Sequence, residues 1–260
     1  MHDDREPAGV GRGRRVAFDG ITNFRDLGGY PTIGGGLTRW GLVYRADALH
    51  KMTDEDLRSF ESLGVLVIYD LRGDVERTEF PGRLASLHAP IIGRPAGSPP
   101  IGAQPGVSTS DGEAILRDMY VGILEHSATQ IGAILRGLSD PQRVPAVFHC
   151  HGGKDRTGVV AAVLLLALGV DPEMVLDDYV LTSEYRRIEH QQDSLANMLA
   201  QGLPLEAAAG VLGTPRWAMA AAVTAITEHY GGIDTYLAHH AGMSSDEVSA
   251  LREALVDRSN

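Results

Sequence analysis

A chain of 260 residues, 43% hydrophobic and 22% charged, has the composition of a globular protein that can bury a substantial core. Its formal net charge of −11 at pH 7 argues against nucleic acid as the main partner. The longest apolar run, from Val159 to Leu168, spans about half of a membrane and is typical of a buried helix, so we expect no stable membrane insertion.

The first residues are charged and glycine-rich without apolar periodicity, which predicts disorder over residues 1–14. No apolar stretch typical of a secretory signal follows Met1. We therefore expect a cytoplasmic protein by default, with secretion without a signal peptide as the alternative. Residues 15–260 are expected to form one domain, and the oligomeric state is left open.

The chain then predicts short strands and turns, broken by Pro31 and by the glycines at 34–36. Thr53, followed by Asp56 three residues later, predicts a capping box at the start of a short helix. The β-branched run 65–69 comes directly after this helix. Such a run is typical of a strand buried in a parallel sheet.

Residues 92–112 are rich in proline, glycine and serine. A loop of this length inside a domain predicts a mobile lid over a site, with a surface insertion as the alternative. A long helix is expected over Glu113–Leu138. The apolar strand Ala146–His149 then leads into Cys150, and the apolar stretch 157–168 predicts a buried central helix.

The remaining pattern is helical. Helices alternate with apolar strands over the first two-thirds of the chain, and helices alone fill the last third. The fold class is therefore predicted as α/β, with a mostly parallel central sheet flanked by helices and an all-helical C-terminal extension. The last helices are expected over roughly 172–200, 215–230 and 233–240, and from Ser244 onward.

The segment Cys150–Arg156, the phosphate loop, carries the candidate chemistry because it joins a strand to a helix, where open α/β sheets bind ligands. Gly152 and Gly153 allow successive backbone N–H groups to converge as an anion nest. The helix that follows directs its positive N-terminal end to the same point. A phosphate-sized dianion fits this arrangement.

Cys150 is the only cysteine, so an intrachain disulfide is excluded. At the base of the nest, a helix N-terminus and nearby cations would favour its reactive thiolate. We interpret it as the nucleophile that attacks phosphorus and forms a cysteinyl-phosphate, which water hydrolyses. Arg156 offers a planar fork for two phosphoryl oxygens, and the Thr157 hydroxyl would stabilise the departing thiolate. A buried cysteine beside a surface arginine is the alternative, but it leaves so polar a segment between two apolar elements unexplained.

The sequence from His149 to Gly158 (HCHGGKDRTG) resembles the active-site loop of protein tyrosine phosphatases. The Lys154-Asp155 pair before the arginine is similar to an atypical bacterial branch of that family, which includes a secreted mycobacterial enzyme. The resemblance covers nearly the whole chain from about residue 20 and implies a single phosphatase domain. It is also carried by residues 23–29, 44–45, 70–72 and 231–236.

The resemblance implies hydrolysis of phosphomonoesters with broad specificity, on phosphotyrosine and on phosphoserine and phosphothreonine, with no cofactor and no metal. The implied partner is a phosphorylated protein. A phosphoinositide or inositol phosphate is the alternative substrate, which Lys154 favours as a ligand for a second phosphate and the net charge disfavours. A phosphate-binding module without turnover is a further alternative, although it would need no thiolate. The ten histidines show no spacing typical of a metal site.

The general acid that protonates the leaving oxygen has two candidates, because the Trp-Pro-Asp motif of ordinary tyrosine phosphatases is absent. Asp155 lies within the phosphate loop at the rim, although its cationic neighbours favour its ionised form. Asp70 ends an apolar strand, where catalytic groups gather in such folds. We expect Asp155 to be the acid and Asp70 a support that holds Arg156 or another loop group.

The other candidate residues divide into contacts with the phosphate and supports of the loop. Lys154 is expected to attract the phosphate, with a solvated rim charge as the alternative. His149 is expected to orient the loop through hydrogen bonds. The predicted contacts are His151, Gly152, Gly153 and Lys154, and the predicted supports are His149, Arg25 and Arg45.

Overall fold

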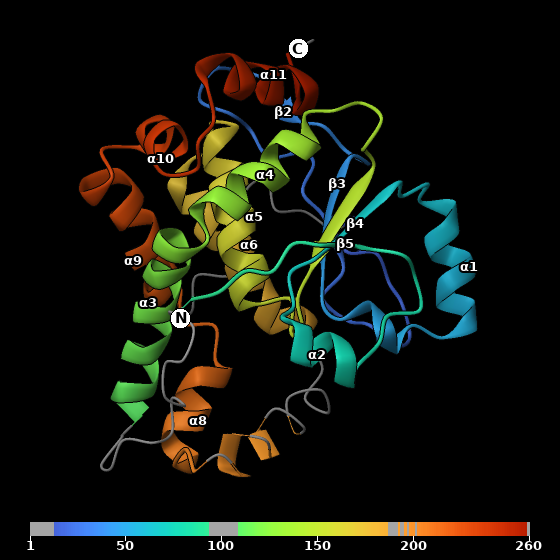
Figure 1. Cartoon of the computed structure of the whole chain (residues 1–260), viewed down its shortest axis with the longest axis vertical. Coiled ribbons are helices and arrows are strands. Elements are labelled where there is room, and N and C mark those ends of the chain that lie inside the picture. Colours follow the sequence, from blue (N-terminus) through green and yellow to red (C-terminus); the bar gives the residue numbers. More distant parts are fainter. Residues whose placement is uncertain are drawn as a thin grey trace, which may run out of the picture.

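The computed structural model describes residues 13–93, 109–186, 192, 195–196, 198–200 and 202–258. At its centre is a five-stranded sheet of order β1-β3-β6-β4-β5, in which only the β1–β3 pair is antiparallel (Figure 1). The predicted mostly parallel α/β sheet is therefore confirmed. The strands are β1 (Arg25–Asp26), β3 (Val43–Ala46), β4 (Val67–Asp70), β5 (Leu87–His88) and β6 (Ala146–His149).

Helices flank this sheet, and the predicted buried central helix is α5 (Asp155–Ala167), all of whose residues from Thr157 onward are buried. The predicted capping box also forms, since Thr53 Oγ1 accepts the Asp56 N–H at 3.1 Å and the Asp56 carboxylate accepts the Thr53 N–H at 3.0 Å. The other helices of this region are η1 (Leu49–Lys51), α1 (Asp54–Ser62), α2 (Asp74–Glu79), α3 (Thr109–His126), α4 (Ala128–Leu138) and α6 (Pro172–Tyr185).

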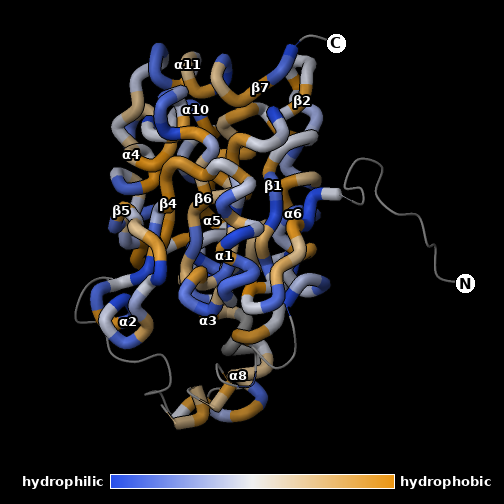
Figure 2. The backbone as a smooth tube through the Cα atoms, turned by 90° about the vertical axis from the view of Figure 1, so that its right-hand side faces the viewer, coloured by the Kyte–Doolittle hydropathy of each residue, from blue (hydrophilic) through white to orange (hydrophobic). Residues whose placement is uncertain are grey.

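Side chains of the central strands alternate between two cores on opposite faces of the sheet. Tyr69 and Phe148 belong to the larger core, which includes α3, α4 and α5. Their strand neighbours Ile68 and Val147 belong to the smaller core, which includes Phe60 of α1. Figure 2 shows that the backbone segments along β4, β6 and α5 are apolar. The two cores hold β6, and with it the start of the phosphate loop, in the middle of the fold.

The long helix expected over Glu113–Leu138 is two helices, α3 and α4, which break at Ser127. The backbone of Ser127 is not helical, with φ −121° and ψ 12°. Its hydroxyl accepts the Ile92 N–H at 2.8 Å and donates to the Ile92 carbonyl at 2.9 Å. These bonds to a distant segment compete with the helix, and the local sequence contains no sign of them.

Two predicted loops fall largely outside the described residues. Of the expected lid 92–112, residues 94–108 are not described, and residues 109–112 belong to α3 rather than to a loop. Of the segment 1–14, residues 1–12 are not described, and the prediction is wrong for Arg14, which is buried. The Arg14 guanidinium donates to the Asp26 carbonyl at 3.0 Å and lies 3.8 Å from the centre of the Tyr30 ring.

The C-terminal region is mainly helical, and the Ser244 cap is confirmed by an Oγ that accepts the Glu247 N–H at 3.2 Å. The region is not all-helical, however, because β7 (Val256–Asp257) pairs with β2 (Leu37–Thr38) in a second, antiparallel sheet. Within the described part of the chain, no helix combines the length and apolar character needed to cross a membrane. The C-terminal helices are α8 (Leu205–Leu212), α9 (Arg216–Thr224) with a π-helical turn over Ala225–His229, α10 (Ile233–His239) and α11 (Ser245–Leu255).

Candidate active site

The phosphate loop connects β6 to the N-terminus of α5, as predicted, and Cys150 at its base is 2% exposed. Gly153 has a φ of 64°, in the left-handed region, and a Cβ there would lie 2.7 Å from the carbonyl oxygen of Ala46. Glycine is needed at this position both for the backbone conformation and for the close approach of β3. A glycine turn at a helix N-terminus is the arrangement typical of an oxyanion nest.

Two buried side chains donate hydrogen bonds to the carbonyl oxygen of Gly153. Asn23 Nδ2 donates to it at 3.0 Å, and Arg45 Nη2 donates to it at 2.9 Å. Arg45 also pairs with Asp178 of α6 at 2.5 Å, and Arg25 pairs with the same carboxylate at 2.9 Å. Arg45 therefore contacts the loop directly, whereas Arg25 contacts its partner Asp178. Asp178 and Asn23 were not among the predicted site residues.

Arg45 and Asp178 are fully buried, and their surroundings shift the pKa of both groups. Burial and the neighbouring Arg25 lower the pKa of Arg45 to about 10, although Asp178 opposes the change. Burial alone would raise the pKa of Asp178, but Arg25 and Arg45 hold it well below its usual value. The carboxylate is therefore ionised between the two guanidinium groups at neutral pH.

Arg156 meets a carboxylate that the sequence did not single out. Both Nη atoms of Arg156 bond to Glu76 of α2, with Nη2 to Oε1 at 2.7 Å and Nη1 to Oε2. Burial alone would raise the pKa of Glu76, but the hydrogen bond from Arg156 lowers it overall. The only local signal was the position of Glu76 as the third residue of a short helix, which is equally common for simple helix caps.

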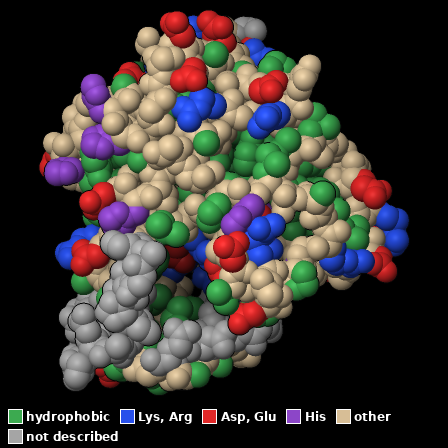
Figure 3. Space-filling model, viewed as in Figure 1, with side chains coloured by type: hydrophobic (Ala, Val, Ile, Leu, Met, Phe, Trp, Pro, Cys, Tyr) green, Lys and Arg blue, Asp and Glu red, His purple; other side chains and the backbone are tan. Residues whose placement is uncertain are grey.

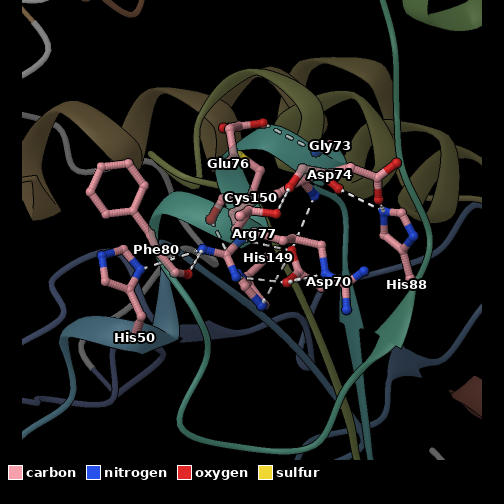
Figure 4. Close-up of polar contacts among 12 residues, drawn as sticks. His50, Asp70, Gly73, Asp74, Glu76, Arg77, Phe80, His88, His149 and Cys150 are labelled. Carbon is pink, nitrogen blue, oxygen red and sulfur yellow. Dashed lines mark hydrogen bonds and ion pairs between the residues drawn. The ribbon is translucent and has the colours of Figure 1, made fainter.

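Asp70 does not contact Arg156 but accepts hydrogen bonds from Arg72, at 2.9 Å from Nε and 2.7 Å from Nη2 (Figure 4). Burial would raise the pKa of Asp70, but these bonds and the nearby His149 lower it overall. His149 Nε2 lies 3.9 Å from Asp70, and His149 Nδ1 donates to the Cys150 carbonyl at 3.1 Å. The structure thus places Asp70 behind the loop and connects it to the loop through His149.

Lys154 was predicted either to attract the phosphate or to be a solvated charge at the rim, and the structure places it in neither position. Its side chain is buried, and Nζ donates to the carbonyls of Val211 at 2.5 Å and Gly213 at 2.7 Å, where α8 ends. Carbonyl groups at a helix C-terminus lack helical partners and attract cations. Lys154 is therefore neither a solvated rim charge nor an uncommitted ligand for phosphate, and it ties the phosphate loop to α8.

Asp155 is the first residue of α5, and its side chain is 31% exposed. Its Oδ1 accepts the Tyr120 hydroxyl of α3 at 2.6 Å and lies 3.3 Å from Lys154 Nζ. Tyr120 in turn shares a hydrogen bond of 2.7 Å with the Tyr179 hydroxyl. Of the two predicted acids, Asp155 alone belongs to the loop and combines partial exposure with fixed partners.

Two polar groups of the site are buried without a hydrogen-bond partner in the described part of the chain: the Thr157 hydroxyl and Nδ1 of His151. The Thr157 hydroxyl is therefore not engaged by another described group. The His151 ring packs against Phe80 and His50, with ring centres 5.2 and 5.9 Å apart. Burial lowers the pKa of His151, so its ring is mostly neutral at neutral pH.

One cation beside the loop was missed. The Arg186 guanidinium lies 3.7 Å from the position that a Cβ of Gly152 would occupy, and it makes no hydrogen bond or ion pair with the described residues. On the face shown in Figure 3, basic and acidic side chains are interspersed rather than gathered in a positive patch. This face therefore presents no extended positive surface to an anion. No group of three or more His, Cys, Asp or Glu among the described residues is arranged to hold a metal ion.

Comparisons with known proteins agree with this geometry. A protein of Cupriavidus necator, named as a candidate tyrosine-protein phosphatase, is 29% identical over 227 residues, which cover 85% of this chain and 82% of its own. A tyrosine-protein phosphatase of Nostoc commune is 28% identical over 219 residues, which cover 81% of this chain and 73% of its own. The triple specificity protein phosphatase PtpB of Mycobacterium tuberculosis is 32% identical over 124 residues, which cover 43% of this chain and 44% of its own.

The family model described as the tyrosine phosphatase family matches residues 16–257. This range contains the sheet, the phosphate loop and the residues that donate hydrogen bonds to the loop. The chain belongs to the tyrosine phosphatase family.

Proposed function

We propose that this enzyme hydrolyses phosphotyrosine and also phosphoserine and phosphothreonine, through a cysteinyl-phosphate on Cys150. The observation that carries the proposal is the buried cysteine at the base of a glycine turn and a helix N-terminus, with Arg156 in the same loop. The family and the names of the relatives support the tyrosine-phosphatase part. The breadth of specificity is supported by the similarity to the triple-specificity enzyme over part of the chain.

In the first step, the Cys150 sulfur bonds to phosphorus as the bond from phosphorus to the ester oxygen breaks. The leaving oxygen takes a proton from Asp155, and Arg156 holds the equatorial oxygens as charge moves onto them. In the second step, water attacks phosphorus and gives a proton back to Asp155. The sulfur–phosphorus bond breaks, inorganic phosphate forms, and Thr157 stabilises the thiolate that returns.

Phosphoinositides are a second candidate substrate class. Lys154 no longer favours them, because its ammonium group is engaged by the carbonyls at the end of α8. Arg186, beside Gly152, is the described cation placed to meet a second phosphate. An inositol ring with two phosphates would then bind between the loop and the end of α6.

The test is a substrate panel with the wild type and Cys150→Ser side by side. We expect the highest kcat/KM on phosphotyrosine peptides, measurable turnover of phosphoserine and phosphothreonine peptides, and none with Cys150→Ser. The variant should still bind inorganic phosphate. Turnover retained by Cys150→Ser would refute the nucleophile, and a clear preference for phosphoinositides would favour the second substrate class.

A further inference from the structure

Two buried tyrosine hydroxyls lie behind the carboxylate of Asp155 and connect it to the core. Tyr120 of α3 and Tyr179 of α6 are 0% and 1% exposed, and their rings meet edge to face with centres 5.9 Å apart. Both helices pack against α5, the helix that Asp155 begins (Figure 1). A Cβ at Gly158 would lie 3.3 Å from Cδ2 of Tyr179, so the glycine lets this ring lie close to the first turn of α5.

The hydrogen bonds between these groups have a definite direction. An ionised carboxylate only accepts hydrogen bonds, so the Tyr120 hydroxyl donates its single proton to Asp155 Oδ1, at 2.6 Å. The bond of 2.7 Å between the two hydroxyls must then have Tyr179 as its donor. The three groups therefore form a chain that runs from Tyr179 through Tyr120 to Asp155.

Both tyrosines remain protonated while Asp155 gains and loses its proton. Burial raises the pKa of Tyr120 well above its usual value, and the neighbouring Asp155 raises it further. Burial and Asp155 likewise raise the pKa of Tyr179, although its bond to Tyr120 opposes this change. At neutral pH the Tyr120 hydroxyl is therefore a permanent donor and not a competing acid.

Lys154 occupies the second acceptor site of the same carboxylate oxygen. An ammonium group has three donors, and two of them go to the carbonyls of Val211 and Gly213. The third faces Asp155 Oδ1, which lies 3.3 Å from Nζ. Each carboxylate oxygen has about two lone-pair sites, so Tyr120 and Lys154 together fill those of Oδ1. Oδ2 makes no hydrogen bond or ion pair with the described residues, and it is the oxygen left to carry a proton.

We propose that Tyr120 is a positioning residue for proton transfer by Asp155, and that Oδ2 is the oxygen from which the proton leaves. This inference rests on the function proposed above. As the proton moves from Oδ2 to the ester oxygen, the electron pair of the O–H bond stays on the carboxylate, and the two donors at Oδ1 stabilise its charge without moving. In the second step, Oδ2 accepts the proton of the attacking water in the same orientation. Tyr179 supports this arrangement because it donates to Tyr120 and fixes the direction of that hydroxyl.

A defect in proton transfer depends on the leaving group, whereas a general loss of structure does not. Phenyl phosphate releases a phenol whose pKa is about 10, like that of tyrosine, and needs a proton as its bond to phosphorus breaks. p-Nitrophenyl phosphate releases a much more acidic phenol and needs the proton less. Because kcat/KM reports the steps up to this bond cleavage, its ratio between the two esters isolates the proton transfer.

The experiment compares Tyr120→Phe with Tyr236→Phe. Tyr236 is 0% exposed and donates to the Leu124 carbonyl of α3 at 2.9 Å, so its variant removes one buried hydroxyl bond to the same helix without touching Asp155. For Tyr120→Phe, we expect kcat/KM to fall about tenfold on phenyl phosphate, as for a misplaced catalytic group, and less than about threefold on p-nitrophenyl phosphate. Tyr236→Phe should keep the wild-type ratio between the esters.

Tyr179→Phe tests the same arrangement through the next hydroxyl and leaves the bond between Tyr120 and Asp155 in place. We expect a loss in the same direction but smaller, about two- to fivefold on phenyl phosphate, as for one neutral hydrogen bond. Circular dichroism and thermal unfolding establish that each variant is folded before its kinetics are measured. An equal effect on both esters in any folded variant of Tyr120 or Tyr179 overturns the proposal.

A double variant checks that Tyr120 acts through Asp155. Asp155→Asn removes the proton itself, so kcat/KM on phenyl phosphate should fall at least about 100-fold. In that background, Tyr120→Phe should change the value by less than about twofold, as expected when two residues act as one unit. A further loss of about tenfold would overturn the proposal, because Tyr120 would then act on another group.

The wild type separates the two proposals. If it hydrolyses neither ester, the proposed function fails and this inference fails with it. If it hydrolyses both esters and Tyr120→Phe keeps the same ratio as Tyr236→Phe, the function stands and only the role of Tyr120 is refuted.

Discussion

Removing the charge of Asp178 should destabilise the whole fold, because this carboxylate lies between two buried guanidinium groups. In Asp178→Asn, Arg25 and Arg45 keep their charges at side-chain exposures of 0% and 1% but lose their counter-ion. Breaking a buried pair in this way costs about 3–5 kcal/mol of unfolding free energy. For a chain of this size, each kcal/mol lowers Tm by about 2–4 °C, so we expect a fall of about 6–20 °C.

The control is the adjacent Asp177, whose side chain is 31% exposed and pairs with Arg216 at 3.2 Å. Asp177→Asn removes the same charge from the same helix, and an exposed pair of this kind contributes less than about 1 kcal/mol. Thermal and urea unfolding followed by circular dichroism measure both variants. If Asp178→Asn costs no more than Asp177→Asn, the argument from buried, uncompensated charge is wrong.

The pH dependence of this effect has a definite sign. Arg25 and Arg45 hold the pKa of Asp178 well below its usual value, whereas the unfolded carboxyl titrates at about 3.9. The contribution of Asp178 to stability is therefore complete above the unfolded pKa and is lost as the pH falls through the lower, folded pKa. The difference in unfolding free energy between wild type and Asp178→Asn should stay constant from pH 7 to about 5 and shrink only below about pH 4.

Two further predictions concern the loop. The alkaline limb of the pH–rate profile on p-nitrophenyl phosphate should disappear in Asp155→Asn and survive in Asp70→Asn, and the reverse result would exchange the acid and the support. Lys154→Met should cost about 1–3 kcal/mol of unfolding free energy in urea, because two buried carbonyls at the end of α8 lose their donor. A tenfold loss of phosphate affinity with an unchanged Tm would instead make Lys154 a ligand.

The strand–loop–helix unit around Cys150 could be predicted because its signals are local. An apolar strand, two glycines and an apolar helix follow one another directly, and each element depends mainly on its own residues. The same holds for the capping boxes at Thr53 and Ser244, where cap and partner are three residues apart. These short-range patterns locate the phosphate loop and the helix that directs its N-terminus into it.

The partners of the loop could not be predicted, because they come from distant parts of the chain. Glu76 is separated from Arg156 by 80 positions, and Asp178 from Arg45 by 133. Lys154 was expected to attract the phosphate, with a solvated rim charge as the alternative, but Val211 contributes a carbonyl acceptor 57 positions away. Pairing of buried charges depends on topology, and one sequence without its fold does not specify it.

The pairing of β2 with β7 has a consequence for how the protein is made. Leu37 pairs with Asp257 and Thr38 with Val256, and the Arg39 N–H donates to the Leu255 carbonyl at 2.8 Å. β2 thus gains its strand partner β7 only from residues that are synthesised more than two hundred positions later. Contacts of such long range form late and slow the search for the native topology. During synthesis β2 therefore lacks its strand partner until β7 has been made, and this is a stage at which chaperones or aggregation can intervene.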